Sequence, residues 1–190
     1  MTTARLSLAH ATARLSVLLL GASLAVVGGS ASAHGPSRLK ASETISISAP
    51  PAQVWDLIKD FGNAHAWLPM VTATESTGGN EPGADRTLSL GGTAKVHEKL
   101  KRYDAQAMTY TYTIPADTHD VKILPVTNYT STISVEPATG GSLVTWRAAF
   151  YRGYPNNDPP AELNDDAAEA AVKGLYQAGL ANLKKLAEGQ

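Results

Sequence analysis

Hydrophobic periodicity changes once along the chain, near residue 160, and this change leaves few possible folds. Between Met70 and Tyr154 apolar and polar residues mostly alternate, which is typical of strands with one buried face. After Leu163 apolar residues recur every three or four positions, which predicts one long amphipathic helix. The helical stripe contains Leu163, Ala167, Ala171, Leu175 and Ala178 and is widened by Val172, Tyr176, Leu180 and Leu183. Because the sequence predicts no second long apolar helix in the domain, this one must cover the buried face of the sheet.

The order of the predicted elements indicates an α+β fold. A strand is expected over Glu43–Ser48 and a short helix from Pro51, followed by about six strands joined by glycine-containing turns. Consecutive strands with such short connections usually pair antiparallel. We therefore expect a curved antiparallel sheet of about six to seven strands, wrapped around the C-terminal helix, in one domain over residues 43–188.

Small residues lie on or beside the inner face of the predicted C-terminal helix. They are Ala167, Ala170, Ala171, Gly174 and Ala178. Such residues permit either close packing of the helix backbone on the sheet or a space between the two layers. We favour a ligand cavity and keep close packing as the alternative.

The first 33 residues have the pattern of a secretory signal peptide. Arg5 and Arg14 precede an apolar run over residues 17–27, which is shorter than the ~20 residues that a membrane-spanning helix needs. The segment Ala31-Ser32-Ala33 that follows matches a signal-peptidase site. We therefore predict cleavage after Ala33, export to the periplasm without a membrane anchor, and an N-terminal extension over residues 34–42.

Composition excludes several classes of function. Lys and Arg number 16 and Asp and Glu number 17, so the net charge of −1 offers no basic surface for nucleic acid. Cysteine is absent, which excludes disulfides, cysteine-ligated zinc, iron–sulfur clusters and thiol nucleophiles. The five histidines are scattered, and no phosphate-binding or dinucleotide-binding motif is present. We predict no metal and no cofactor.

Strand parity brings charged residues to the apolar face of the predicted sheet. A three-residue Gly-Gly-Thr loop pairs Leu88 with Val96 and therefore Arg86 with Glu98. The same parity across the next turn puts Tyr112 beside Glu98. This arrangement predicts an ion pair at the floor of the cavity, because a buried carboxylate needs such a partner. The alternative is that Glu98 acts as a general acid or base, which makes it the candidate catalytic residue.

Aromatic side chains with polar tips suit a pocket for an amphipathic molecule. The predicted cavity residues are Arg86, Glu98, Tyr110, Tyr112, Trp146 and Trp67. A separate loop rich in turn-forming residues joins the last strand to the long helix, and we expect it to gate the cavity or to contact a partner protein. The candidate residues of this loop are Tyr154, Asn156, Asn157 and Asp158.

Three segments resemble the helix-grip fold of the START-related SRPBCC superfamily, which includes polyketide cyclase/dehydrase proteins and lipid carriers. They are residues 47–55, where a strand enters its helix, the Phe61-Gly62-Asn63 segment with Trp67 and Pro69, and Leu143-Val144-Thr145-Trp146. More narrowly, the His34-Gly35-Pro36 start, Leu124-Pro125-Val126 and residues 146–158 resemble the exported MxaD-type proteins, which are associated with periplasmic methanol oxidation.

The resemblance implies a non-catalytic periplasmic protein that binds a small apolar or amphipathic ligand, periplasmic redox proteins, or both. Such a protein could assist the contact between an alcohol dehydrogenase and its cytochrome. Two alternatives remain at this point: an enzyme similar to polyketide cyclases or dehydratases that uses Glu98, and a periplasmic lipid or quinone carrier.

Overall fold

A computed structural model describes residues 35–190, so the predicted signal peptide lies outside the described residues. The strands of the fold are β1 (Leu39–Ile47), β2 (Ala73–Thr77), β3 (Asp85–Ser89), β4 (Lys95–Asp104), β5 (Thr109–Thr113), β6 (Val126–Ala138) and β7 (Gly141–Arg152). The helices are α1 (Pro51–Ile58), the 3-10 helices η1 (Phe61–Ala66) and η2 (Ala161–Leu163), and α2 (Asp165–Glu188). None of the helices in residues 35–190 is both long and apolar enough to cross a membrane.

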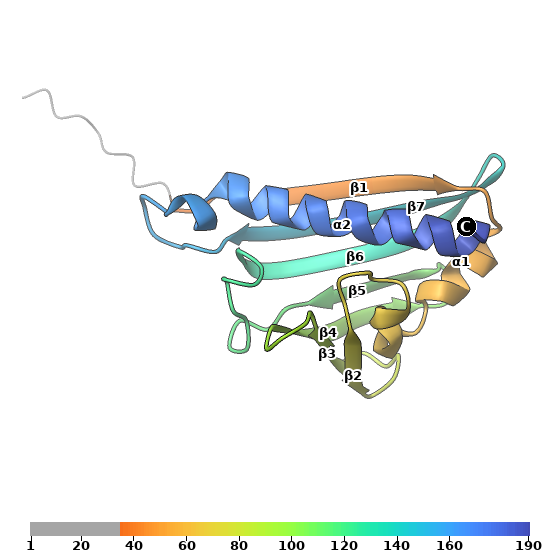
Figure 1. Cartoon of the computed structure of the whole chain (residues 1–190), viewed down its shortest axis with the longest axis horizontal. Helices are drawn as coiled ribbons and strands as arrows, with labels where there is room; N and C mark the ends of the chain where they lie inside the picture. The colour runs from red at the N-terminus through yellow and green to blue at the C-terminus, as the bar shows by residue number, and fades with distance from the viewer. Residues whose placement is uncertain (1–34) are drawn as a thin grey trace, which may run out of the picture. The chain divides into compact units, whose positions relative to one another are not determined.

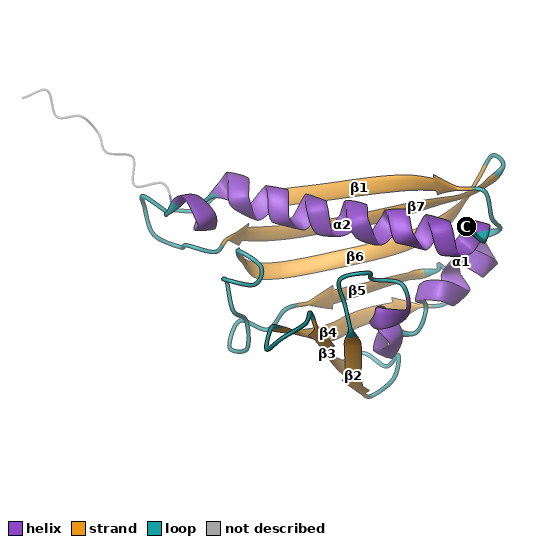
Figure 2. Ribbon diagram, viewed as in Figure 1, coloured by secondary structure: helices purple, strands orange, loops and turns teal. Residues whose placement is uncertain are grey.

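The seven strands form one antiparallel sheet in the order β1-β7-β6-β5-β4-β3-β2. Figure 1 shows α2 lying along one face of the sheet beside β1 and β7. Helix α1 lies near the C-terminal end of α2, η1 packs on β2 and β3, and η2 directly precedes α2. Figure 2 makes the two layers plain, with a continuous sheet of strands and one long helix against it. The predicted α+β architecture, a curved antiparallel sheet around the C-terminal helix, is confirmed.

Helix α2 has well-defined ends and one buried face. Asn164 caps its first turn by accepting a hydrogen bond from the backbone N–H of Ala167 at 2.8 Å, and Gly189 ends it in the left-handed region at φ 69°. The buried residues are Ala168, Val172, Tyr176, Gly179, Leu180, Leu183 and Ala187. The bulkier half of the predicted stripe therefore faces the sheet, where it buries more apolar surface. Ala178, from the other half, is exposed.

Strand β1 begins four residues before the predicted strand, so part of the expected N-terminal extension belongs to the sheet. Leu39 pairs with Phe150 on β7. Ala41 is buried and pairs with Ala148. Alanine is a weak strand former, and the charged Glu43 interrupts the alternating apolar positions that begin with Leu39 and Ala41, so the sequence pattern indicates a strand only from Glu43 onward.

The β4–β5 connection differs from the predicted turn, and the pairing of Tyr112 changes with it. The turn covers residues 105–108, one residue more than expected, and a β-bulge between Leu100 and Arg102 restores the alternation of faces. As a result, Tyr112 pairs with Leu100 rather than with Glu98. The predicted direct pairing of Tyr112 with Glu98 is wrong, although both side chains face the same side of the sheet.

Candidate functional site

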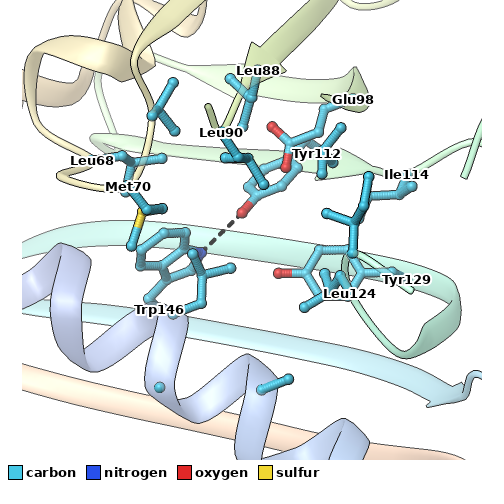
Figure 3. A pocket seen from close by; sticks show the side chains of 16 residues that line it. Leu68, Met70, Leu88, Leu90, Glu98, Tyr112, Ile114, Leu124, Tyr129 and Trp146 are labelled. Atoms are coloured by element: carbon cyan, nitrogen blue, oxygen red, sulfur yellow. Dashed lines mark hydrogen bonds between the residues drawn. The ribbon is translucent and has the colours of Figure 1, made fainter. Parts of the chain in front are cut away.

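A cavity of about 370 Å³ lies between α2 and the buried face of the sheet. Its volume falls near the lower end of the range of about 300–1,000 Å³ that is usual for small-molecule sites. Most of its wall is aliphatic, as Figure 3 shows. The aliphatic residues include Leu68, Met70, Leu88, Leu90, Ile114 and Leu124. The wall therefore suits the body of an apolar molecule.

Small residues of α2 leave one side of the cavity open. Ala171, Gly174 and Leu175 are the helix residues that line it. Gly174 is exposed, and a Cβ atom added to it would meet nothing within 4 Å. The space expected from small residues on the helix is therefore present here. Ala170 and Ala178, which the sequence pattern places beside this face, are exposed and do not line the cavity.

A buried ion pair lies at one wall of the cavity. Arg86 Nε donates to Glu98 Oε2 at 2.6 Å, and the two residues pair across β3 and β4 as predicted. They are 2% and 6% exposed, respectively. Arg86 also donates to the carbonyl oxygen of Phe61 at 2.9 Å, and its guanidinium carbon lies 4.1 Å from the centre of the Phe61 ring. Glu98 lines the cavity, whereas Arg86 lies behind it.

The two charges of the pair depend on each other. Burial raises the pKa of the Glu98 carboxyl above its ordinary value, and the charge of Arg86 opposes this shift. Burial acts to lower the pKa of Arg86, but the charge and hydrogen bond of Glu98, together with the nearby Tyr110 and Tyr112, outweigh it, so the pKa of Arg86 rises. The guanidinium therefore stays protonated. Because a neutral Glu98 would leave this buried cation without a counter-charge, the carboxylate is the favoured form at neutral pH.

Beside the ion pair, hydroxyl groups form a buried network that includes one side chain of α2. Tyr176 on α2 bonds to the hydroxyls of Tyr129 at 2.6 Å and Ser131 at 2.7 Å. Trp146 Nε1 donates to Ser131 Oγ at 2.9 Å and to the hydroxyl of Tyr112 at 3.2 Å. The Trp146 ring stacks on the Tyr176 ring with centroids 4.2 Å apart. The network therefore joins β5, β6, β7 and α2 at the polar end of the cavity.

The predicted cavity residues divide into two groups. Glu98, Tyr112 and Trp146 line the cavity. Arg86, Tyr110 and Trp67 are buried but lie outside its wall, so their predicted contact with a ligand is not part of this geometry.

Those three residues support the wall from behind. Tyr110 packs against Tyr112, a residue of the wall, with ring centroids 6.1 Å apart. Trp67 packs against Trp146 at 5.2 Å.

The predicted loop lies away from the cavity wall. Tyr154, Asn156, Asn157 and Asp158 are absent from the lining of the cavity. Arg152 holds the loop by donating to the carbonyl oxygens of Tyr154 at 2.8 Å and Asn156 at 2.9 Å. Asn156, Asn157 and Asp158 are exposed, so a role in contacting a partner stays a prediction, and nothing in the lining supports a gate.

Sequence reasoning missed Ser131 and Tyr176 as parts of the site. Ser131 is an inward-facing polar residue between Tyr129 and Ile133 on β6, which is an unusual place for a serine. The helical periodicity assigns Tyr176 only to the apolar stripe. The signal that could have found them is the need of a buried hydroxyl for partners.

No group of three or more His, Asp or Glu side chains within residues 35–190 is placed to hold a metal ion. His119 instead bonds through Nε2 to the carbonyl oxygen of Leu124 at 2.8 Å, in the loop beside the cavity.

Comparison with known proteins places this geometry in a family. Residues 38–188 match the family model described as polyketide cyclase / dehydrase and lipid transport. The chain is 30% identical to the protein XoxI from Bacillus cereus, with a TM-score of 0.63, covering 80% of this chain and 95% of that one. A protein from Thermobifida fusca is 28% identical, with a TM-score of 0.60 and coverage of 78% and 91%.

Ara h 8.0201 shares the fold at 20% identity, with a TM-score of 0.62 and coverage of 81% of this chain and all of that one (100%). No match was found among curated proteins. Since the family model spans the sheet, the cavity and α2, the chain belongs to the polyketide cyclase / dehydrase and lipid transport family, within the SRPBCC superfamily.

Proposed function

We propose that this protein is an exported, non-catalytic binding protein that holds a small apolar or amphipathic molecule between α2 and the sheet. The observation that carries the proposal is the cavity of about 370 Å³, with aliphatic walls and an opening beside Gly174. Apolar surface that faces an empty space lacks packing partners, and an apolar molecule supplies them.

The ion pair between Glu98 and Arg86 favours a role in binding over a role in catalysis. Its Oε2 is held by Arg86 at 2.6 Å, so one side of the carboxylate is committed to an ion pair. A general base must take a proton from its substrate, and protonation of Glu98 would leave Arg86 unpaired. The alternative of a cyclase or dehydratase rests on the family description and on the presence of Glu98 in the cavity wall.

We further propose that the bound molecule or the exposed loop links the protein to periplasmic methanol or alcohol oxidation. The support is the resemblance to the MxaD-type proteins and the 30% identity to the protein XoxI from Bacillus cereus. In this role the protein would assist the contact between a dehydrogenase and its cytochrome. The alternative function, a lipid or quinone carrier, would use the same cavity, but the bound molecule would be a lipid or a quinone.

A binding experiment with a plugged cavity tests the proposed function. Titration with the neutral apolar dye N-phenyl-1-naphthylamine should give saturable fluorescence enhancement. Gly174→Leu places an aliphatic side chain at the opening and should weaken binding by about tenfold or more, equivalent to ~1.4 kcal/mol. Ala178→Leu is the matched control, because it adds the same side chain to an exposed position of α2 outside the lining.

Two results would contradict the proposed function. One is the absence of saturable binding of the dye to the native protein, and the other is an equal loss in both leucine variants. Native mass spectrometry of protein purified from periplasm should show an added mass that ethanol extraction removes. N-terminal sequencing of the same sample should begin at His34 if export and cleavage occur as predicted.

A further inference from the structure

We propose that the cavity selects a neutral molecule with a hydroxyl group at one end of an apolar body, such as an aliphatic alcohol or a phenol, and discriminates against carboxylates. This inference rests on the proposed function and names the chemical class of its ligand. The hydrogen-bond donors and acceptors at the polar end of the cavity carry it.

Most protons of the buried network are already committed. Ser131 Oγ donates its single proton to the carbonyl oxygen of Arg147 at 3.1 Å. Its 2.7 Å bond to Tyr176 must therefore be donated by Tyr176. Since Tyr176 has then used its own proton, the 2.6 Å bond between Tyr129 and Tyr176 must be donated by Tyr129. The direction of the chain is thus fixed from Tyr129 through Tyr176 and Ser131 to a backbone carbonyl.

Tyr112 differs from the other hydroxyls in this network, because its proton has no acceptor among residues 35–190. Its oxygen accepts from Trp146 Nε1 at 3.2 Å, drawn as the dashed line in Figure 3. The nearby Ser131 Oγ already accepts from both Trp146 and Tyr176, so its two lone pairs are occupied. Burial raises the pKa of Tyr112 well above its ordinary value, so the hydroxyl keeps its proton. Tyr112 is 1% exposed and lines the cavity, which makes it a donor available to a ligand.

Glu98 supplies the complementary acceptor. Its Oε2 bonds to Arg86, and no hydrogen bond reaches its Oε1 within the described part of the chain. Glu98 lies on β4 and Tyr112 on β5, and both face the cavity one diagonal step apart, a Cα separation of about 7–8 Å. Figure 3 shows the carboxylate and the phenol ring on the same wall. The wall of the cavity therefore offers a ligand one donor, from Tyr112, and one acceptor, from Glu98.

A hydroxyl group matches this pair because it accepts from Tyr112 and donates to Glu98 at the same time. An ether can only accept, so it leaves the Glu98 oxygen without a partner. A carboxylate places a second negative charge beside Glu98 in an apolar cavity, where like charges repel strongly. The order of preference is therefore alcohol, then ether, then carboxylate.

Three probes of similar size test the proposal. They are 1-octanol, its isomer 1-methoxyheptane, and octanoate at pH 8, each titrated by competition with N-phenyl-1-naphthylamine. We expect 1-octanol to bind about tenfold more tightly than 1-methoxyheptane, the effect of one hydrogen bond to a charged acceptor, and octanoate to bind most weakly. Equal affinity for all three would overturn the head-group preference while leaving the proposed apolar site intact. Failure of the dye and all three probes to bind would overturn the proposed function itself.

Two variants assign the preference to its residues. Tyr112→Phe removes the free proton but keeps the ring, and it should weaken 1-octanol and 1-methoxyheptane alike. Glu98→Gln should reduce the difference in affinity between 1-octanol and octanoate. If this variant does not fold, Tyr112→Phe still tests whether the Tyr112 hydroxyl donates to the ligand. Tyr110→Phe is the matched control, because Tyr110 is equally buried on the same strand but outside the lining. An unchanged 1-octanol affinity in Tyr112→Phe would overturn the proposal.

Discussion

Two glycines of α2, five residues apart, lie in opposite environments. A Cβ on Gly179 would come within 2.8 Å of Trp146 Cζ3 and 2.9 Å of Leu68 Cδ2, whereas a Cβ on Gly174 would meet nothing within 4 Å. We call the region around Gly179 the packed end and the region around Gly174 the hollow end. The same helix and the same sheet thus make a solid core at one end and a cavity at the other.

The cavity is built by its surroundings and does not arise from loose packing of the whole interface, because the same helix packs tightly at Gly179. At the packed end, the close approach of the helix backbone holds Trp146 in place against Trp67. Trp146 also lines the hollow end, so the packed end fixes part of the cavity wall. A rigid frame beside a hollow keeps the hollow from collapsing.

The largest expected effect concerns the ion pair in the wall of the hollow end. Glu98→Gln leaves Arg86 as a buried cation without a counter-charge and should lower the free energy of unfolding by about 3–5 kcal/mol. Urea denaturation measures this change. Asp85→Asn is the matched control, because it breaks the exposed Lys99–Asp85 pair of the same two strands and should cost less than about 1 kcal/mol.

The double variant Arg86→Met/Glu98→Leu shows whether the loss of stability comes from the unpaired charge of Arg86. Removing both charges takes away the unpaired cation, so the double variant should recover much of the lost stability. If Glu98→Gln lowers the free energy of unfolding by no more than Asp85→Asn does, the stability of the hollow end does not depend on the buried ion pair.

At the packed end, Gly179→Ala should destabilise the protein although alanine favours helices. The added methyl would overlap the Trp146 ring and the Leu68 side chain, and overpacking of this kind costs about 1–3 kcal/mol. The gain in helix propensity, about 1 kcal/mol, offsets part of this cost. Urea denaturation with tryptophan fluorescence should show a net loss. A net gain in stability would mean that Trp146 and Leu68 shift at little cost, so that the packed end does not hold the cavity wall in place.

The part of the fold that can be predicted well from sequence depends on local periodicity. The change from alternation to a helical period indicates the sheet and α2, and the parity of the loop between β3 and β4 gives the correct Arg86–Glu98 pairing. Both follow from the period-two geometry of strands and from short turns. The ion pair therefore follows from the amino-acid sequence alone.

The errors arise where the outcome depends on contacts between distant segments. The longer turn over residues 105–108 and a β-bulge after Leu100 together change the partner of Tyr112, and nothing in the local sequence marks a bulge there. The bond from Tyr176 to Ser131 joins residues 45 positions apart, so no spacing rule reveals it. Small residues on α2 predict a space but not its extent, because Gly174 and Gly179 look alike in sequence and differ in what faces them.

The smallest expected effect, at the hollow end, has the opposite sign to that of Gly179→Ala. Gly174→Ala adds a methyl group into open space in the middle of a 24-residue helix, so only the backbone preference changes. Alanine is favoured over glycine in a helix by up to about 1 kcal/mol, and the free energy of unfolding should rise by ~0.5–1 kcal/mol. Urea denaturation measures this gain in the free energy of unfolding, with Gly179→Ala measured under the same conditions for comparison. Because the methyl is too small to fill the opening, the affinity for N-phenyl-1-naphthylamine should stay within about twofold of the native value, unlike that of Gly174→Leu. A loss of stability in Gly174→Ala would mean that the helix packs at Gly174 as tightly as at Gly179, and the distinction between the two ends would then fail.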